Sequence, residues 1–176
     1  IPGNADRRTP ATLDAVTTAL TIDHPFRNAE CVVCLIDMHE GKITAGTRRH
    51  LHELARVDEG LSIVLACHYP MEHCLHDPDV RSIVASGQVA LFIGAHCHED
   101  RQYTVESIPA HTIRGLDPDK AIGGPPAVAM FELADRRWTR SEIPFDEGTA
   151  NTWSPSMRKD FVEHLGFSCM THSLEG

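Results

Sequence analysis

Continuous apolar runs alternate with amphipathic segments through the first hundred residues. Three apolar runs predict strands that are covered on both faces, at 32–36, 61–66 and 89–93. Helical spacing of apolar residues, with polar residues on the other side, predicts helices over 9–20, 45–57 and 77–86. The order strand, helix, strand, helix, strand is typical of an α/β fold in which helices pack on a sheet.

Beyond His98 the pattern changes to short runs separated by Pro, Gly and Asp. These runs predict a series of antiparallel strands, at 103–108, 111–114, 127–133 and 138–143. A polar linker follows over 146–155, and a helix is predicted over 157–165. We therefore expect one domain over 1–145, and over 146–176 a linker and helix that could begin a further domain.

Composition narrows the class of protein. The chain has 176 residues, a length that suits a single domain of ~100–200 residues. No apolar run approaches the ~18–20 residues of a membrane span, so no membrane partner is expected. The formal charge of -9 disfavours nucleic acid as a steady partner.

Without a signal peptide, a cytoplasmic location is expected, and the six cysteines are interpreted as free thiols. Cys31 and Cys34 have the spacing of a redox or zinc pair, but their apolar surroundings favour burial in a strand.

Histidines follow two of the predicted strands. His68 comes soon after the second strand, and His96 and His98 follow the third. The carboxyl ends of strands are where sites form in open α/β sheets, and imidazole binds zinc, iron and manganese. These positions indicate a shared metal site, although histidines that are simply polar loop residues would give the same pattern. His73 and His76 are candidate substrate contacts or further ligands, with a solvated loop as the alternative.

The residues around these histidines resemble a known family. An apolar strand ending in His68, two before Pro70, precedes a second apolar strand that ends in Gly94-Ala95-His96-Cys97-His98. This arrangement resembles the calcineurin-like metallophosphoesterases, whose second element is Gly-His-x-His, with Ala95 here in place of that glycine. The segment Gly3-Asn4-Ala5-Asp6 resembles the family's Gly-Asn-His-Asp/Glu element, with Ala5 in place of histidine. The resemblance extends over residues 1–145.

The resemblance implies a fold, a cofactor and a reaction. The fold would be a mixed two-sheet sandwich flanked by helices, with its amino-terminal strands missing from this chain. Two divalent ions such as manganese, iron or zinc would hydrolyse phosphate mono- or diesters. Asn4, His68 and His96 would bind one ion and His98 its neighbour. No catalytic residue is assigned, because Ala5 replaces the family's histidine.

The resemblance also bears on completeness and activity. The family's other ligands belong to Asp-x-His and Gly-Asp elements, which this chain lacks. We therefore expect the chain to be inactive alone and to pair with a missing amino-terminal segment or a second copy. The alternative is a catalytically impaired metal-binding or regulatory module of the same fold.

Overall fold

The computed structural model describes residues 26–27, 30–56, 60–115, 122, 124, 127–134 and 137–144. The predicted helices over 9–20 and 157–165, and the linker over 146–155, lie outside these residues. Asn4 and Ala5 also lie outside them.

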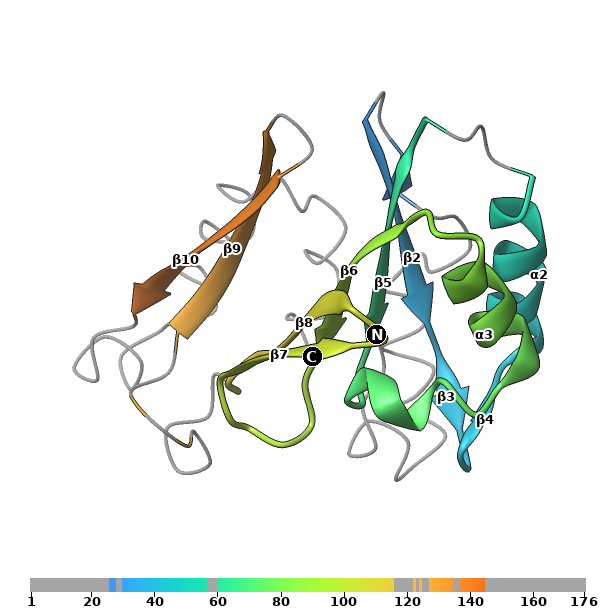
Figure 1. Cartoon of the computed structure of the whole chain (residues 1–176). Helices are drawn as coiled ribbons and strands as arrows, with labels where there is room; N and C mark the ends of the chain where they lie inside the picture. Colours follow the sequence, from blue (N-terminus) through green and yellow to red (C-terminus); the bar gives the residue numbers. More distant parts are fainter. Residues whose placement is uncertain are drawn as a thin grey trace, which may run out of the picture.

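A six-stranded mixed sheet forms the centre of the described structure (Figure 1). Its order is β1-β2-β5-β6-β8-β7, and the strands are β1 (Phe26–Arg27), β2 (Cys31–Ile36), β5 (Ser62–Cys67), β6 (Val89–Gly94), β7 (Arg101–Val105) and β8 (Ile108–Thr112). Strands β2, β5, β6 and β8 are parallel, while β1 and β7 are antiparallel edges. The three predicted strands and the α/β class are thus confirmed.

Two helices connect the parallel strands, and both begin at a capping side chain. The side chain of Thr44 accepts a hydrogen bond from the backbone of Thr47 at the start of α2 (Ala45–Leu54). Asp77 caps α3 (Pro78–Ala85) in the same way, with Pro78 in the first turn as predicted. The 3-10 turn η2 (Met71–His73) lies between β5 and α3. Both helices are confirmed, and α2 ends three residues earlier than the amphipathic pattern predicted.

Two hairpins complete the described elements. Strands β3 (Met38–His39) and β4 (Lys42–Ile43) form a hairpin in a stretch where the apolar pattern predicts no strand. Their turn is possible because Glu40 and Gly41 both adopt positive φ, at 50° and 75°, which suits a tight hairpin. Strands β9 (Ala127–Ala134) and β10 (Arg137–Pro144) pair antiparallel over their whole length, as predicted.

The strand boundaries in the β7–β8 region were predicted wrongly. The pattern placed a break near Pro109, whereas the turn lies at Glu106 and Ser107, whose φ values are 49° and 69°. Pro109 is tolerated in β8 because pairing with β6 begins only at Ala110, so its missing N–H falls outside that ladder. Strand β8 also pairs parallel with β6, so this region is not purely antiparallel.

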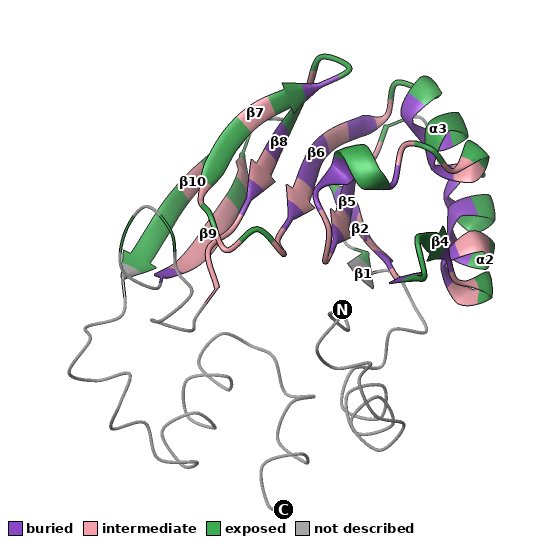
Figure 2. Cartoon of the chain, turned by 90° about the horizontal axis from the view of Figure 1, so that it is seen from below, coloured by how far each residue is buried: buried purple, intermediate pink, exposed green. Residues whose placement is uncertain are grey.

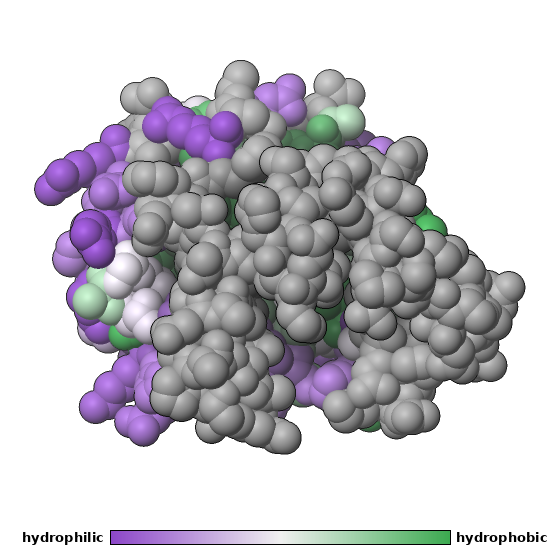
Figure 3. Space-filling view, turned by 180° about the vertical axis from the view of Figure 1, so that it is seen from behind, coloured by the Kyte–Doolittle hydropathy of each residue, from purple (hydrophilic) through white to green (hydrophobic). Residues whose placement is uncertain are grey.

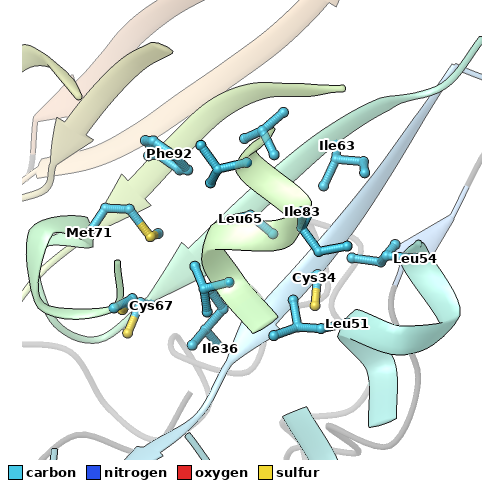
Figure 4. Packing of buried hydrophobic residues seen from close by; sticks show 14 of the residues in the cluster. Cys34, Ile36, Leu51, Leu54, Ile63, Leu65, Cys67, Met71, Ile83 and Phe92 are labelled. Carbon is cyan, nitrogen blue, oxygen red and sulfur yellow. The ribbon is translucent and has the colours of Figure 1, made fainter. Parts of the chain in front are cut away.

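The core lies between the sheet and its two helices. Helices α2 and α3 cover one side of the sheet, and the β9–β10 hairpin lies on the other (Figure 1). Each helix buries one face and exposes the other (Figure 2). Figure 4 shows the apolar side chains that meet between helices and strands, all buried: Cys34, Ile36, Leu51, Leu54, Ile63, Leu65, Cys67, Met71, Ile83 and Phe92. Cys31 and Cys34 are both buried residues of β2, which confirms their interpretation as strand residues.

The surface of the helical layer is polar. Figure 3 shows mostly hydrophilic residues at the edge of the molecule where α2 and α3 lie. Within the described part of the chain, no helix is long and apolar enough to cross a membrane.

Candidate metal centre

The loops that follow β5 and β6 bring His68 and His96 together. The two strands are neighbours in the parallel part of the sheet, with Ala66 opposite Ile93. The backbone N–H of Ala95 donates to the carbonyl oxygen of His68 at 3.2 Å, which joins the two loops directly. Parallel pairing therefore delivers both imidazoles to one edge of the sheet, as the sequence predicted.

Gly94 permits this close approach. A Cβ at position 94 would lie 3.0 Å from the carbonyl oxygen of Tyr69 and 3.2 Å from the Cα of Pro70. Beyond Gly94 the chain turns sharply, because His96 and His98 both adopt left-handed φ, at 70° and 55°. Non-glycine residues with such φ values are uncommon and often occur at functional turns.

The two imidazoles lie within hydrogen-bond distance of each other, a separation that two ligands of one metal ion also have. His68 Nε2 lies 3.1 Å from His96 Nδ1, and the rings meet edge to face at 5.1 Å. Two nitrogens that are each ~2.1 Å from one ion, at ~90–110° to one another, lie ~3.0–3.4 Å apart. The Tyr69 ring packs 4.8 Å from that of His96 and 5.0 Å from that of His68, so it borders the pair.

His98 faces a different neighbour. Its Nδ1 would lie 2.7 Å from a Cβ at Gly115, so the ring is packed against that glycine, and its carbonyl oxygen accepts a hydrogen bond from Ile122. Among the described residues, no group of three or more His, Cys, Asp or Glu side chains is placed to hold a metal ion. The described structure therefore brings together two of the four predicted ligands, while Asn4 lies outside it.

The candidate substrate contacts lie on the surface, and one of them, His73, lies near this pair. His73 and His76 are both exposed, and the His73 ring lies 6.2 Å from that of Tyr69. The turn that carries His73 is fixed through Glu72, which accepts hydrogen bonds from the Tyr103 hydroxyl at 2.9 Å and from Arg101 at 3.2 Å. Burial and the bond to Glu72 both raise the pKa of Tyr103, so it remains the donor.

Asp37 is a neighbour of this edge that the sequence interpretation did not assign. Ile36 lies opposite Cys67, so Asp37 leaves β2 beside the point where His68 leaves β5. A hydrogen bond from Cys74 lowers the pKa of Cys67, and the Asp37 carboxylate is close enough to oppose that shift. The signal in the sequence was an aspartate directly after an apolar strand.

A network of charged residues joins β10 to the loops after β6 and β8. Arg114 donates to Glu142 at 2.6 Å, and Arg140 donates to Asp100 at 2.5 Å and to Glu142 at 2.6 Å. The two arginine side chains are only 8% and 10% exposed. The Arg114 bond lowers the pKa of Glu142 to about 2, whereas burial and the hydrogen bond with Glu142 raise the pKa of Asp100. The network links the hairpin to the loop that carries His98.

The Arg114 side chain also lies against Gly124. A Cβ at Gly124 would collide with the Arg114 guanidinium, so the arginine side chain would have to shift to admit any other residue there. The side chains of Arg114 and Arg140 were not identified from the sequence, since isolated arginines in short strands carry no periodic signal.

No protein-family model matches this chain, and no curated protein matches it.

Proposed function

We propose that the chain supplies part of the metal site of a metallophosphoesterase that hydrolyses phosphate mono- or diesters with two divalent cations. The observation that carries this proposal is the 3.1 Å contact between His68 Nε2 and His96 Nδ1 at the ends of adjacent parallel strands. That separation suits two ligands of one ion. The sequence around both histidines resembles the calcineurin-like class.

In this proposal each residue has a defined task. His68 and His96 hold one cation, with Asn4 as its third ligand from this chain, and His98 serves the neighbouring cation. When bound, such cations lower the pKa of bound water and neutralise phosphate oxygens. His73 and His76, which are both exposed, would contact the phosphate ester.

The fold supports the same class in outline. The β9–β10 hairpin lies across the central sheet from the two helices (Figure 1). The ring of Phe131 on β9 packs 5.2 Å from that of His111 on β8. We propose that this hairpin belongs to the second sheet of a two-sheet sandwich. The remaining metal ligands would come from an amino-terminal segment or from a second copy.

Metal binding by the purified chain tests the site. Manganese or zinc is titrated calorimetrically, and bound metal is counted after dialysis. We expect His68→Ala and His96→Ala each to weaken binding by at least ~10-fold, since loss even of a residue that supports a ligand costs ~10–100-fold. The matched control is His52→Ala, on the exposed face of α2, where the ring contacts Asp79. Equal binding by all four proteins would refute the site.

Binding of inorganic phosphate then tests the class of ligand. We expect phosphate to bind the manganese-loaded chain and to lose affinity when His68 is replaced. Metal binding without any phosphate binding would instead support the alternative, a metal-binding or regulatory module that lacks turnover.

A further inference from the structure

Two buried arginines lie on either side of one partly exposed carboxylate. Arg114 donates to Glu142 Oε2 at 2.6 Å, and Arg140 donates to Glu142 Oε1 at 2.6 Å, so each carboxylate oxygen accepts from one arginine. The arginine side chains are 8% and 10% exposed, whereas the Glu142 side chain is 29% exposed. The two cations are therefore held inside the structure, and the carboxylate between them lies nearer to solvent.

Both arginines keep a buried donor that Glu142 does not satisfy. Among the residues that the structure describes, the Nε atoms of Arg114 and Arg140 are buried without a hydrogen-bond partner, and so is Nε1 of Trp138. Trp138 and Arg140 are two residues apart in β10, so their side chains leave the same face of the hairpin. Buried donors are nearly always paired in proteins, because an unpaired one costs free energy. The cluster thus offers more N–H groups than one carboxylate accepts.

We propose that Arg114 and Arg140 form a binding site for a phosphate-type oxyanion, which takes the place of the Glu142 carboxylate between them. Each oxygen of the carboxylate already accepts from one arginine Nη2 atom, and the Nε donors stay unused. A tetrahedral phosphate has more oxygens and accepts from the Nε and Nη2 atoms of both guanidinium groups, the paired geometry that arginine favours with phosphate. Glu142 is then an internal competitor, whose side chain turns toward solvent when the anion binds.

The charges around the arginines suit this exchange. The hydrogen bond from Arg114 lowers the pKa of Glu142 to about 2, which shows that the position favours a negative charge. Asp100 accepts from Arg140 at 2.5 Å and lies 3.8 Å from Arg114, so one carboxylate stays with the two cations when Glu142 leaves.

The topology places this anion site near the candidate metal centre. Arg114 follows β8, which runs parallel to β6, so it leaves the sheet at the edge where His96 follows β6. The anion-site proposal does not rest on the proposed function, because it requires no metal ion.

The experiment titrates inorganic phosphate calorimetrically into the full chain with a chelator present, so that no divalent cation contributes. The informative variant is Glu142→Gln, which removes the competing charge and leaves both arginines in place. Its matched control is Glu132→Gln, the same change at an exposed residue of β9 in the same hairpin. We expect Glu142→Gln to bind phosphate at least ~10-fold more tightly than the wild type, since a hydrogen bond to a charged group is worth a factor of ~10 or more. Glu132→Gln should bind phosphate as the wild type does.

Lysine variants test the role of the guanidinium groups. Arg114→Lys and Arg140→Lys, each combined with Glu142→Gln, keep the positive charge but lose the paired Nε and Nη2 donors, so the gain in affinity should disappear. The proposal is overturned if Glu142→Gln binds phosphate no more tightly than Glu132→Gln, or if the lysine variants retain the gain.

Two further measurements keep the test decisive. Circular dichroism verifies that each variant is folded. If Glu142→Gln does not fold, the wild type is compared with Arg114→Lys, and equal phosphate binding by these two proteins overturns the proposal. His68→Ala should leave phosphate binding without metal unchanged, so the anion site can fail or succeed separately from the proposed function.

Discussion

Replacing Gly94 by alanine tests how closely the two histidine loops approach. The added methyl group would lie 3.0 Å from the carbonyl oxygen of Tyr69 and 3.2 Å from the Cα of Pro70. Both atoms belong to the backbone, so neither can rotate away, and the chain that follows His68 must shift. Overpacking of this kind costs ~1–3 kcal/mol of the free energy of unfolding. We expect Gly94→Ala to lower the free energy of unfolding by that amount and also to weaken metal binding.

Two other glycines provide matched controls for the same chemical change. At Gly46, in α2, the nearest atom to an added Cβ is Thr44 Oγ1 at 3.9 Å, so alanine should stabilise the helix by up to ~1 kcal/mol. At Gly87 the space is open but φ is +75°, so alanine should cost ~1–2 kcal/mol through backbone strain alone. The three variants separate crowding, helix propensity and left-handed backbone.

Denaturant and thermal unfolding, both followed by far-ultraviolet circular dichroism, measure the stability of all three variants. For a chain of this size, 1 kcal/mol corresponds to ~2–4 °C in melting temperature, so the Gly94→Ala variant should melt ~2–12 °C lower. Metal titration on the same variant reports whether the histidine pair has moved. If Gly94→Ala unfolds at the wild-type midpoint and binds metal normally, the loops do not approach as the structure describes, and the reasoning is refuted.

Three further perturbations test the site, the charged network and the helix start. Ala5→His should raise phosphoesterase turnover in the complete site without changing metal content, and an unchanged background rate at full metal occupancy would favour the binding module. Glu142→Gln should lower stability at neutral pH, because the folded-state pKa of about 2, held down by Arg114, lies below the ordinary 4.5. The stability difference between the variant and the wild type should have its full size above pH 4.5 and should shrink as the pH falls toward 2. A difference that persists at pH 2 would contradict this prediction. Thr47→Val should cost ~0.5–1.5 kcal/mol in the same unfolding assay, since the hydroxyl that accepts the partly buried Asp37 N–H at 2.9 Å is lost. A change below the error of the assay would contradict this role.

Features that depend on a few consecutive residues could be predicted from the sequence. Strands β2, β5 and β6 were predicted because each is a short, nearly continuous apolar run bounded by polar residues. Helix α3 was predicted because Asp77 and Pro78 mark its start and its apolar residues recur at helical spacing. The placement of His68 and His96 at one edge followed from the parallel order of these strands.

Features that depend on distant segments could not be predicted in the same way. Strand β8 lies between β6 and β7, and only this position shows why Pro109 is acceptable in a strand. The ion pairs between Arg114 and Glu142 join residues 28 positions apart, and no local pattern marks them. The short β3–β4 hairpin was not predicted, because two residues per strand give no measurable alternation.

The candidate site shows the same division. The sequence by itself determined which strands are followed by histidines, because apolar runs and the polar residues after them are local properties of the chain. Only the tertiary structure decided that His68 Nε2 and His96 Nδ1 lie 3.1 Å apart while the His98 ring packs against Gly115. The reason is that the direction of each imidazole depends on the left-handed turns at His96 and His98 and on the space that Gly94 and Gly115 leave open, and those contacts form only when the strands are assembled.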